Sequence, residues 1–196
     1  MTYVSCHDNH TLWDRLTISR PEATEAEKIE MHKLAGTIVL TSQGVSFLHA
    51  GVDFIRTKDG VENSYNSPDA INQIDWSRKH TYRGVFDYFR ELIAVRKAHP
   101  AFRMTTTADI QANLKFIDTK DENLVAYTLN GAAVGDSWKR IVVVYNGKDK
   151  AQEVKVPDGN WKIVVNEGII NTEGLGQHSG GKISVARNAA FILVEE

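Results

Sequence analysis

The 196-residue chain has the composition of an ordinary globular protein, with 42% hydrophobic and 24% charged residues. This apolar content is enough for one large or two small domains and excludes disorder along the whole chain. The net charge of −2 comes from scattered acidic and basic side chains, so we expect neither a nucleic-acid nor a membrane partner. The single cysteine, Cys6, excludes an internal disulfide, and we interpret it as a small packed residue. No stretch is apolar over the roughly 18 residues that span a bilayer, and the cellular location stays open.

The first half of the chain alternates between short apolar runs and helical periods. Residues 3–6 predict a short buried strand. Thr24 and Glu27 have the spacing of a capping box, and the apolar residues that follow repeat at helical intervals, which predicts a helix over about 25–42. A second short strand is predicted over 45–51. Strand, helix and strand in this order predict a βαβ unit.

A long segment without a regular period follows, and then a second helix. Residues 52–79 are rich in Asp, Asn, Ser and Gly, and connections of that length in compact domains are usually binding loops or disordered segments. Its aromatic and amide side chains favour a binding loop. An amphipathic helix is predicted over about 82–98, and Pro100 marks its end. We place a domain boundary near residue 104.

Beyond that boundary the apolar period changes to two, which is typical of strands. Short strand candidates are separated by Gly, Asn, Asp and Lys turns at 114–117, 124–129, 140–146, 153–157, 161–166, 182–186 and 190–195. Without intervening helices, they predict an antiparallel sandwich over 105–196. The aromatic residues Tyr127, Trp138, Tyr145 and Trp161 suit a sugar-binding platform as well as a core, and their alternating positions favour the core.

A polar cluster follows the first predicted strand. The segment YVSCHDN at 3–9, followed by TLWD at 11–14, resembles the last sugar-binding motif of the α-amylase clan of glycoside hydrolases, and most of all that of pullulanases, which debranch starch. The resemblance implies that residues 1–104 are the last strand-helix units of a (β/α)8 TIM barrel, followed by a C-terminal β-sandwich domain. It also implies that Asp8 is the transition-state stabiliser, that His7 donates to the same sugar ring, and that no cofactor takes part.

Two other interpretations of His7 and Asp8 compete with the sugar site. Asp8 or Asn9 could cap the helix that begins near TLWD by accepting backbone N–H groups. His7, Asp8 and His10 could instead bind a metal ion. Neighbouring strand residues point to opposite faces, however, so we do not expect His7 and Asp8 to share one ion, and we predict no metal site.

A second segment, NSYNSPDAINQIDW at 63–76, resembles the loop that follows the eighth barrel strand in pullulanases. By that resemblance Asp69 binds the next sugar, and Asn63 and Tyr65 line the same cleft. Gln73 departs from the family, in which an arginine often stands at this position, and this weakens the expected subsite. The alternative is that the polar residues only form turns and that Trp76 and Ile74 anchor the loop to the core. We favour anchoring for Trp76, and both interpretations stay open for Asp69.

The expected function is therefore that of a C-terminal fragment of a pullulanase-like retaining glycosidase acting on α-1,6 branch linkages of starch, glycogen or pullulan. Retaining hydrolysis needs a nucleophile and an acid carboxylate, and the motifs that carry them are not in this sequence. A whole barrel also takes about 250 residues. We expect the chain alone to be inactive, to bind an α-glucan, and to self-associate through its exposed barrel edge. The alternatives are isoamylase or another α-glucan hydrolase, and a non-catalytic carbohydrate-binding or assembly module formed by the sandwich.

Overall fold

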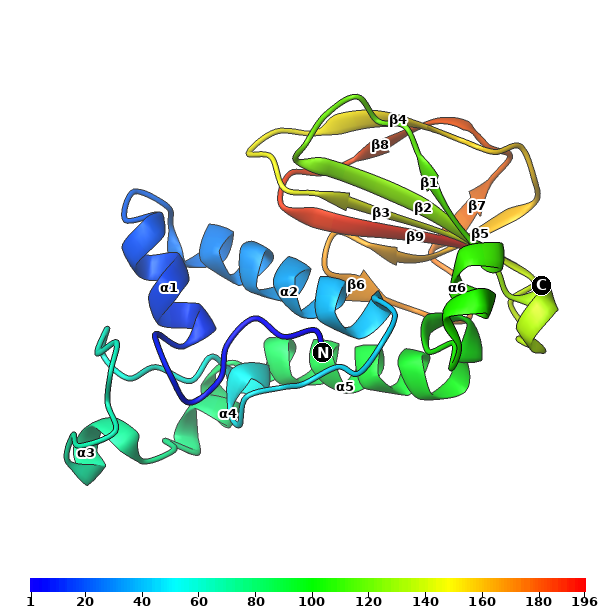
Figure 1. The fold of residues 1–196 in the computed structure, drawn as a ribbon. Helices are drawn as coiled ribbons and strands as arrows, with labels where there is room; N and C mark the ends of the chain where they lie inside the picture. The colour runs from blue at the N-terminus through cyan, green and yellow to red at the C-terminus, as the bar shows by residue number, and fades with distance from the viewer.

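In the computed structural model, which describes all 196 residues, a layer of helices covers one face of an antiparallel sheet (Figure 1). The α-helices are α1 (Leu12–Ser19), α2 (Glu25–Thr41), α3 (Asp69–Asn72), α4 (Ser77–Thr81), α5 (Arg83–Ala98) and α6 (Thr107–Asn113). Short 3-10 turns are η1 (Val52–Phe54), η2 (Pro100–Phe102) and η3 (Ala132–Val134). None of the helices is long and apolar enough to cross a bilayer.

The two long helices confirm the predictions for them. The capping box at the start of α2 is complete, since Thr24 Oγ1 accepts from the Glu27 N–H at 3.3 Å and Glu27 Oε2 accepts from the Thr24 N–H at 2.9 Å. At the other end of α2, the buried Arg96 of α5 donates to the carbonyls of Leu40 at 2.9 Å and Ser42 at 2.8 Å. Arg96 thus satisfies carbonyls that the end of a helix leaves without intrahelical partners.

The larger sheet contains β1 (Leu114–Ile117), β2 (Leu124–Asn130), β3 (Arg140–Asn146), β9 (Ala189–Glu195), β5 (Trp161–Asn166) and β6 (Ile169–Ile170) in that order, with β7 (Gly176–His178) also paired to β5. A second sheet pairs β4 (Gln152–Val156) with β8 (Gly181–Val185). All the pairs of named strands are antiparallel, as predicted, and each strand predicted beyond residue 104 is present within one residue at either end. The prediction missed the short elements α3, α4, α6, β6 and β7, and it gave no bounds for α1.

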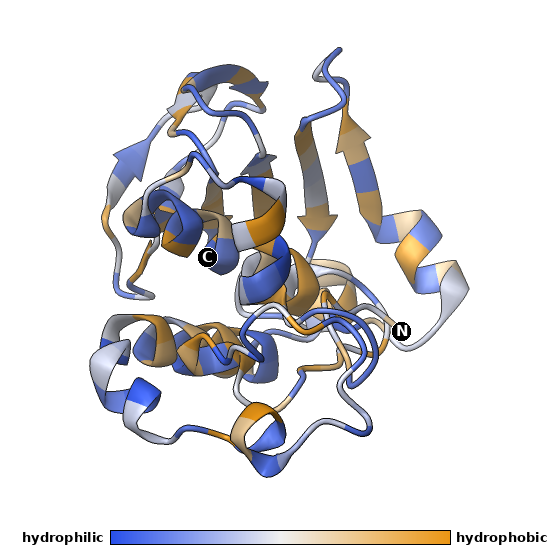
Figure 2. Cartoon of the chain, turned by 90° about the vertical axis from the view of Figure 1, so that its left-hand side faces the viewer, coloured by the Kyte–Doolittle hydropathy of each residue, from blue (hydrophilic) through white to orange (hydrophobic).

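Both faces of the larger sheet are buried, and each contributes to a different apolar core. Along β3, Ile141 and Val143 face the core shared with the helices, whereas Val142 and Val144 face the core shared with β4 and β8. Figure 2 shows orange and blue residues alternating along strands of the molecule. The aromatic residues expected in the core are buried there, namely Tyr127, Trp138, Tyr145 and Trp161.

The helical and sheet halves are joined through a single shared core. Leu34 of α2, Val95 of α5 and Phe102 of η2 belong to the same buried cluster as residues of β2, β3 and β9. Within it, the Tyr145 hydroxyl lies 2.5 Å from Thr41 Oγ1 of α2. The predicted boundary near residue 104 thus falls at a packed interface, and the division of the chain into domains 1–104 and 105–196 stays a prediction.

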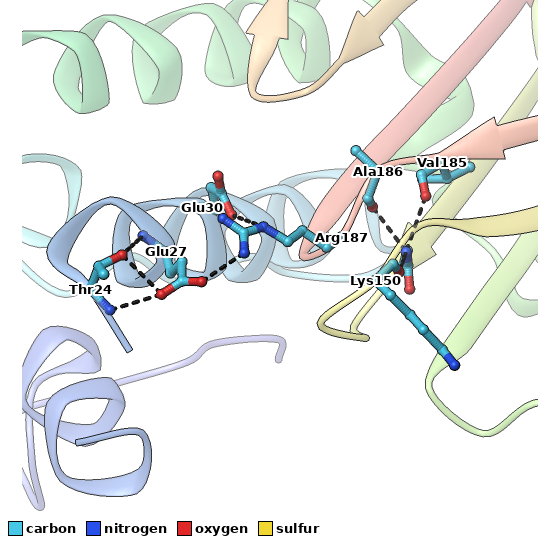
Figure 3. Close-up of polar contacts among 8 residues, drawn as sticks. Thr24, Glu27, Glu30, Lys150, Val185, Ala186 and Arg187 are labelled. Carbon is cyan, nitrogen blue, oxygen red and sulfur yellow. Dashed lines mark hydrogen bonds and ion pairs between the residues drawn. The ribbon is translucent and has the colours of Figure 1, made fainter. Parts of the chain in front are cut away.

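Polar contacts strengthen this interface on one side, near the turn after β8 (Figure 3). Arg187 reaches from the turn to α2, where its Nη1 donates to Glu27 Oε1 at 2.6 Å and its Nε lies 3.4 Å from Glu30 Oε2. The amide of Asn146 lies beside the same turn and donates to the carbonyls of Lys150 and Ala186, both at 2.9 Å. The beginning of α2 and the end of β8 are therefore held together by side chains.

The two strands predicted in the first half are not formed, and this part of the prediction is wrong for the chain as it folds here. Residues 3–6 and 45–51 contain no strand, and only an isolated parallel bridge joins Thr2 to Ser46. Parallel strands occur almost only in sheets covered on both faces, and two short runs without further neighbours cannot supply such a sheet. The bridge is parallel and α2 lies between its two segments, as a βαβ unit requires. A TIM barrel is not established by this arrangement.

Candidate functional site

His7 and Asp8 lie on an exposed bend after the Thr2 bridge. Their side chains are 84% and 68% exposed, and His7 Nδ1 lies 3.0 Å from Asp8 Oδ1. The expectation that the two side chains point to opposite faces was wrong, because the segment bends and Asn9 has a φ of 61°. No group of three or more His, Cys, Asp or Glu side chains is placed to hold a metal ion.

The helix cap in this region is neither Asp8 nor Asn9. Thr11 is the N-cap of α1, and its Oγ1 accepts from the Asp14 N–H at 3.1 Å. The capping interpretation of Asp8 is therefore wrong. His7 is the one basic side chain within 4 Å of the Asp8 carboxylate, and the exposure of Asp8 leaves it open to a ligand.

The predicted subsite residues Asn63, Tyr65 and Asp69 all lie on the exposed surface of the loop between η1 and α4. The Tyr65 residue is 83% exposed, and Asp69 begins the short helix α3. Their side chains make no hydrogen bond within the chain, which leaves their polar atoms available to a ligand. Gln73, at the position where the family often has arginine, is also exposed.

Trp76 contacts the core, as expected for an anchor of the loop, but it is not buried in it. The residue is 66% exposed, although its ring packs on that of the buried Phe54, with 5.5 Å between the ring centroids. One part of the indole is therefore anchored against the core. The remaining surface of Trp76 is accessible, as the apolar face of a sugar ring would require.

The two motif segments are brought together by Lys58, which sequence reasoning did not select. Its Nζ donates to the carbonyl of His7 at 3.3 Å and to Ser64 Oγ at 2.6 Å. The residue is only 4% exposed, so this contact is an internal connection between the bend that carries Asp8 and the loop that carries Asp69.

Asp14, the last residue of TLWD, is the second connection that the sequence did not identify. Its Oδ1 accepts from the Thr57 hydroxyl at 2.5 Å, and its Oδ2 accepts from the Lys58 N–H at 2.8 Å. The same Oδ2 accepts from Thr11 at 2.8 Å. Asp14 is buried and thus holds the start of the long loop against α1. No local pattern marks this role, because Thr57 and Lys58 lie more than forty positions away along the chain.

Basic side chains lie around the contacts of Lys58, namely those of His49 and Arg56. Burial, together with the nearby charges of Arg56 and Lys58, lowers the pKa of His49 to about 4. Burial also lowers the pKa of Lys58, against the opposing influence of the carboxylates of Asp14 and Asp8. Arg56 donates to the carbonyl of Asn72 at 2.6 Å and so fixes the end of α3. The region beside Asp8 is therefore rich in N–H donors, which suit the hydroxyl oxygens of a sugar.

Comparisons with known proteins agree with the motifs. Residues 110–168 match the family model "Pullulanase, all-beta domain". The chain is 44% identical over 158 residues to a pullulanase of Bacillus subtilis, which covers 81% of this chain and 22% of that protein. Its structure superimposes on the pullulanase from Bacillus acidopullulyticus with a TM-score of 0.94 and 44% identity over 98% of this chain and 24% of that one. The chain belongs to the pullulanase family. A pullulanase from Anoxybacillus, solved with maltotriose, gives a TM-score of 0.89 and 39% identity over 100% of this chain and 27% of that chain.

Membership of the pullulanase family agrees with the antiparallel sheet, since the family model of the all-beta domain matches residues 110–168. The chain spans about a quarter of the length of the pullulanases that it matches. The activity of a whole pullulanase is therefore not established for these 196 residues by the similarity.

Proposed function

We propose that this chain forms part of the α-glucan cleft of a pullulanase-like retaining glycosidase that acts on α-1,6 branch linkages of starch, glycogen or pullulan. In this proposal residues 1–104 are the closing part of a (β/α)8 barrel and residues 105–196 are a C-terminal β-sandwich domain. The observation that carries the proposal is the Lys58 connection, which joins the two motif segments while leaving Asp8 exposed.

In the proposed site Asp8 stabilises the transition state. Its two carboxylate oxygens accept hydrogen bonds from adjacent hydroxyls of the sugar at the cleavage point, and His7 donates to the same ring. Charge-assisted hydrogen bonds of this kind can strengthen as positive charge develops on the ring, which lowers the barrier rather than only binding the substrate. Asn63, Tyr65 and Asp69 bind the neighbouring sugar, and the accessible face of Trp76 offers a second apolar surface.

Bond cleavage itself needs two further carboxylates, the nucleophile and the acid, about 5 to 5.5 Å apart. We propose that these groups come from outside the 196 residues, so that the chain alone binds glucan without hydrolysing it. Purified chain incubated with pullulan should then release no reducing sugar above the buffer control. Turnover by the isolated chain would contradict this part of the proposal.

Binding is best tested on the whole chain with maltotriose as the probe. An incomplete cleft is expected to bind with a Kd in the millimolar range, corresponding to about −4 kcal/mol. Removal of a charged hydrogen-bond acceptor costs about 1.5–3 kcal/mol, so Asp8→Asn and Asp69→Asn should each weaken binding at least tenfold. The matched control is Asp149→Asn, an exposed aspartate without hydrogen bonds, which should leave the Kd unchanged. Titration followed by NMR is suited to affinities of this size.

A non-catalytic carbohydrate-binding or assembly module remains the alternative from another class, and isoamylase or another α-glucan hydrolase the alternative within the enzymes. If maltotriose binding survives Asp8→Asn and Asp69→Asn unchanged, the module gains support. Deletion of residues 1–103 is a poorer test, because it would remove Leu34, Val95 and Phe102 from the core that the sheet shares with the helices. Comparison of pullulan with unbranched maltooligosaccharides as ligands addresses the linkage preference.

The edge beside the Thr2–Ser46 bridge also supports the expectation that the isolated chain associates with itself. Tyr3, Val45 and Phe47 expose 53%, 67% and 39% of their surface there, and the bridge leaves backbone groups unpaired. Light scattering should therefore detect dimers or larger species. A monodisperse monomer at high concentration would contradict this expectation.

A further inference from the structure

We infer that Lys58 is a positioning residue, whose buried ammonium group sets the bend that carries His7 and Asp8 against the loop that carries Asp69. The inference deepens the proposed function and rests on it for its meaning in sugar binding. The connection itself is a property of the folded chain and can be measured without a sugar.

The first step of the argument is the position of the ammonium group. Lys58 is 4% exposed, which is rare for a lysine, and its Nζ contacts the backbone carbonyl of His7 and the hydroxyl of Ser64. The contact on the Asp8 side is made to the main chain, so it fixes the bend and leaves the His7 and Asp8 side chains free. The contact on the other side is made 2.6 Å from Ser64 Oγ, inside the long loop.

The second step leads from Ser64 to the helix that begins at Asp69. Ser64 Oγ donates to Asn72 Oδ1 at 2.9 Å, and Asn72 Nδ2 donates back to the carbonyls of Ser64 at 2.7 Å and Ser67 at 2.9 Å. Asn72 is the last residue of α3, and Asp69 is its first. A change at Lys58 is therefore transmitted to Asp69 through one turn of helix.

The third step explains why an ammonium group stands at this position. Burial of an unpaired charge costs several kcal/mol, and an apolar side chain of similar length would pack without that cost. Asp14 compensates part of the cost, because its negative charge lies near the ammonium group. Its carboxylate is held there by a hydrogen bond from the Lys58 backbone N–H. A side chain that only filled space would need neither of the two acceptors of the ammonium group, the His7 carbonyl and Ser64 Oγ. The polar network instead specifies one arrangement of the two loops.

The experiment uses three variants of the whole chain: Lys58→Met, Ser64→Ala and the control Lys97→Met, in which the lysine is exposed and its side chain makes no hydrogen bond. Backbone amide signals are followed by ¹H–¹⁵N NMR, and unchanged signals of β3 and β9 show that each variant is folded. Ser64→Ala is expected to shift the amides of His7 to Asn9, although Ser64 has no hydrogen bond to them. Lys58→Met should shift both these amides and those of Asp69 to Asn72, and Lys97→Met neither.

Maltotriose titration gives the second readout. Lys58→Met should weaken binding about tenfold through the loss of positioning, and the double variant with Ser64→Ala should bind no more weakly than Lys58→Met alone, since both remove the same connection. Additive losses in the double variant, or His7 to Asn9 signals that stay in place in Ser64→Ala, would overturn the inference. Should Lys58→Met fail to fold, Ser64→Ala decides by itself. If the unmodified chain does not bind maltotriose, the proposed function fails, while the amide shifts still decide whether Lys58 couples the loops.

Discussion

Asp136 joins the η3 turn of the sheet half to the end of α5, and its replacement by asparagine tests the interface directly. Its Oδ1 accepts from His99 Nδ1–H at 2.7 Å and from the Trp138 N–H at 2.9 Å, and its Oδ2 accepts from the Ala101 N–H at 2.9 Å. The His99 ring is stacked on Trp138 with 3.4 Å between the ring centroids. The Asp136 side chain is fully buried, so the three donors have no water to replace it.

The expected loss follows from what asparagine can still accept. Its single oxygen can serve only one side of the network, and its NH2 group then faces at least one N–H donor in a site without solvent. Hydrogen bonds to charged groups contribute about 1.5–3 kcal/mol, and an unsatisfied buried donor costs about 1–3 kcal/mol. We therefore expect Asp136→Asn to lower the free energy of unfolding by about 2–4 kcal/mol.

The pH dependence of the same network has a defined sign. Burial by itself would raise the pKa of Asp136, but the hydrogen bonds from His99 and from the backbone N–H groups of Ala101 and Trp138 outweigh it and hold the pKa below its ordinary value. The folded state thus favours the ionised form. The stability from Asp136 is present above the unfolded pKa and is lost as the pH falls through the lower folded pKa. Asparagine should remove this acid-dependent component.

Urea denaturation followed by tryptophan fluorescence measures both effects, because Trp138 lies in the network. Asp149→Asn is the matched control and should change the free energy of unfolding by no more than about 0.5 kcal/mol. If Asp136→Asn and the control lose equally little at pH 7, the three hydrogen bonds do not stabilise the interface and the reasoning is refuted.

Three further changes test other parts of the packing. His32 is buried and its pKa is lowered to about 4 by desolvation, so stability should fall by up to about 3 kcal/mol as the pH drops from 6.5 towards 4, as measured by urea denaturation. In His32→Gln the slope of the free energy of unfolding against pH should decrease by the equivalent of up to one bound proton. An unchanged slope would contradict the assignment of this pH dependence to His32. Gly36→Ala should lower the free energy of unfolding by about 1–3 kcal/mol, as measured by thermal unfolding, because the new Cβ would overlap the ring of Phe89. Gly84→Ala, in open space near the start of α5, should instead raise it by up to about 1 kcal/mol. The reverse order would show that the α2–α5 contact is looser than described. Tyr145→Phe removes a hydroxyl that forms hydrogen bonds with Thr41 of α2 and with Tyr127. It should lower the free energy of unfolding in urea by about 1–2 kcal/mol, and a neutral effect would show that the core hydroxyls are dispensable.

Much of the fold could be predicted because its signals are local. Thr24 and Glu27 mark the start of α2 by spacing alone, and strands such as β4 and β8 alternate buried and exposed residues with the period of a pleated chain. The candidate site was found in the same way, since His7, Asp8 and the 63–76 segment are recognised as short motifs. Whether these residues bind sugar stays a prediction. The missed elements α3, α4, α6, β6 and β7 span seven residues or fewer and are too short to carry a period.

The meeting of distant segments depends on the folded chain as a whole. The runs at 3–6 and 45–51 have the sequence of strands but form a single bridge, because a strand is stabilised by its neighbours as much as by its own residues. Lys58 and Asp14 look like ordinary charged residues in the sequence, and their roles depend on partners supplied by other segments of the chain. Local patterns set where a helix begins and which face of a strand is apolar, since propensity and capping act within a few residues. The pairing of buried charges is determined by three-dimensional proximity, and no short stretch of sequence encodes that.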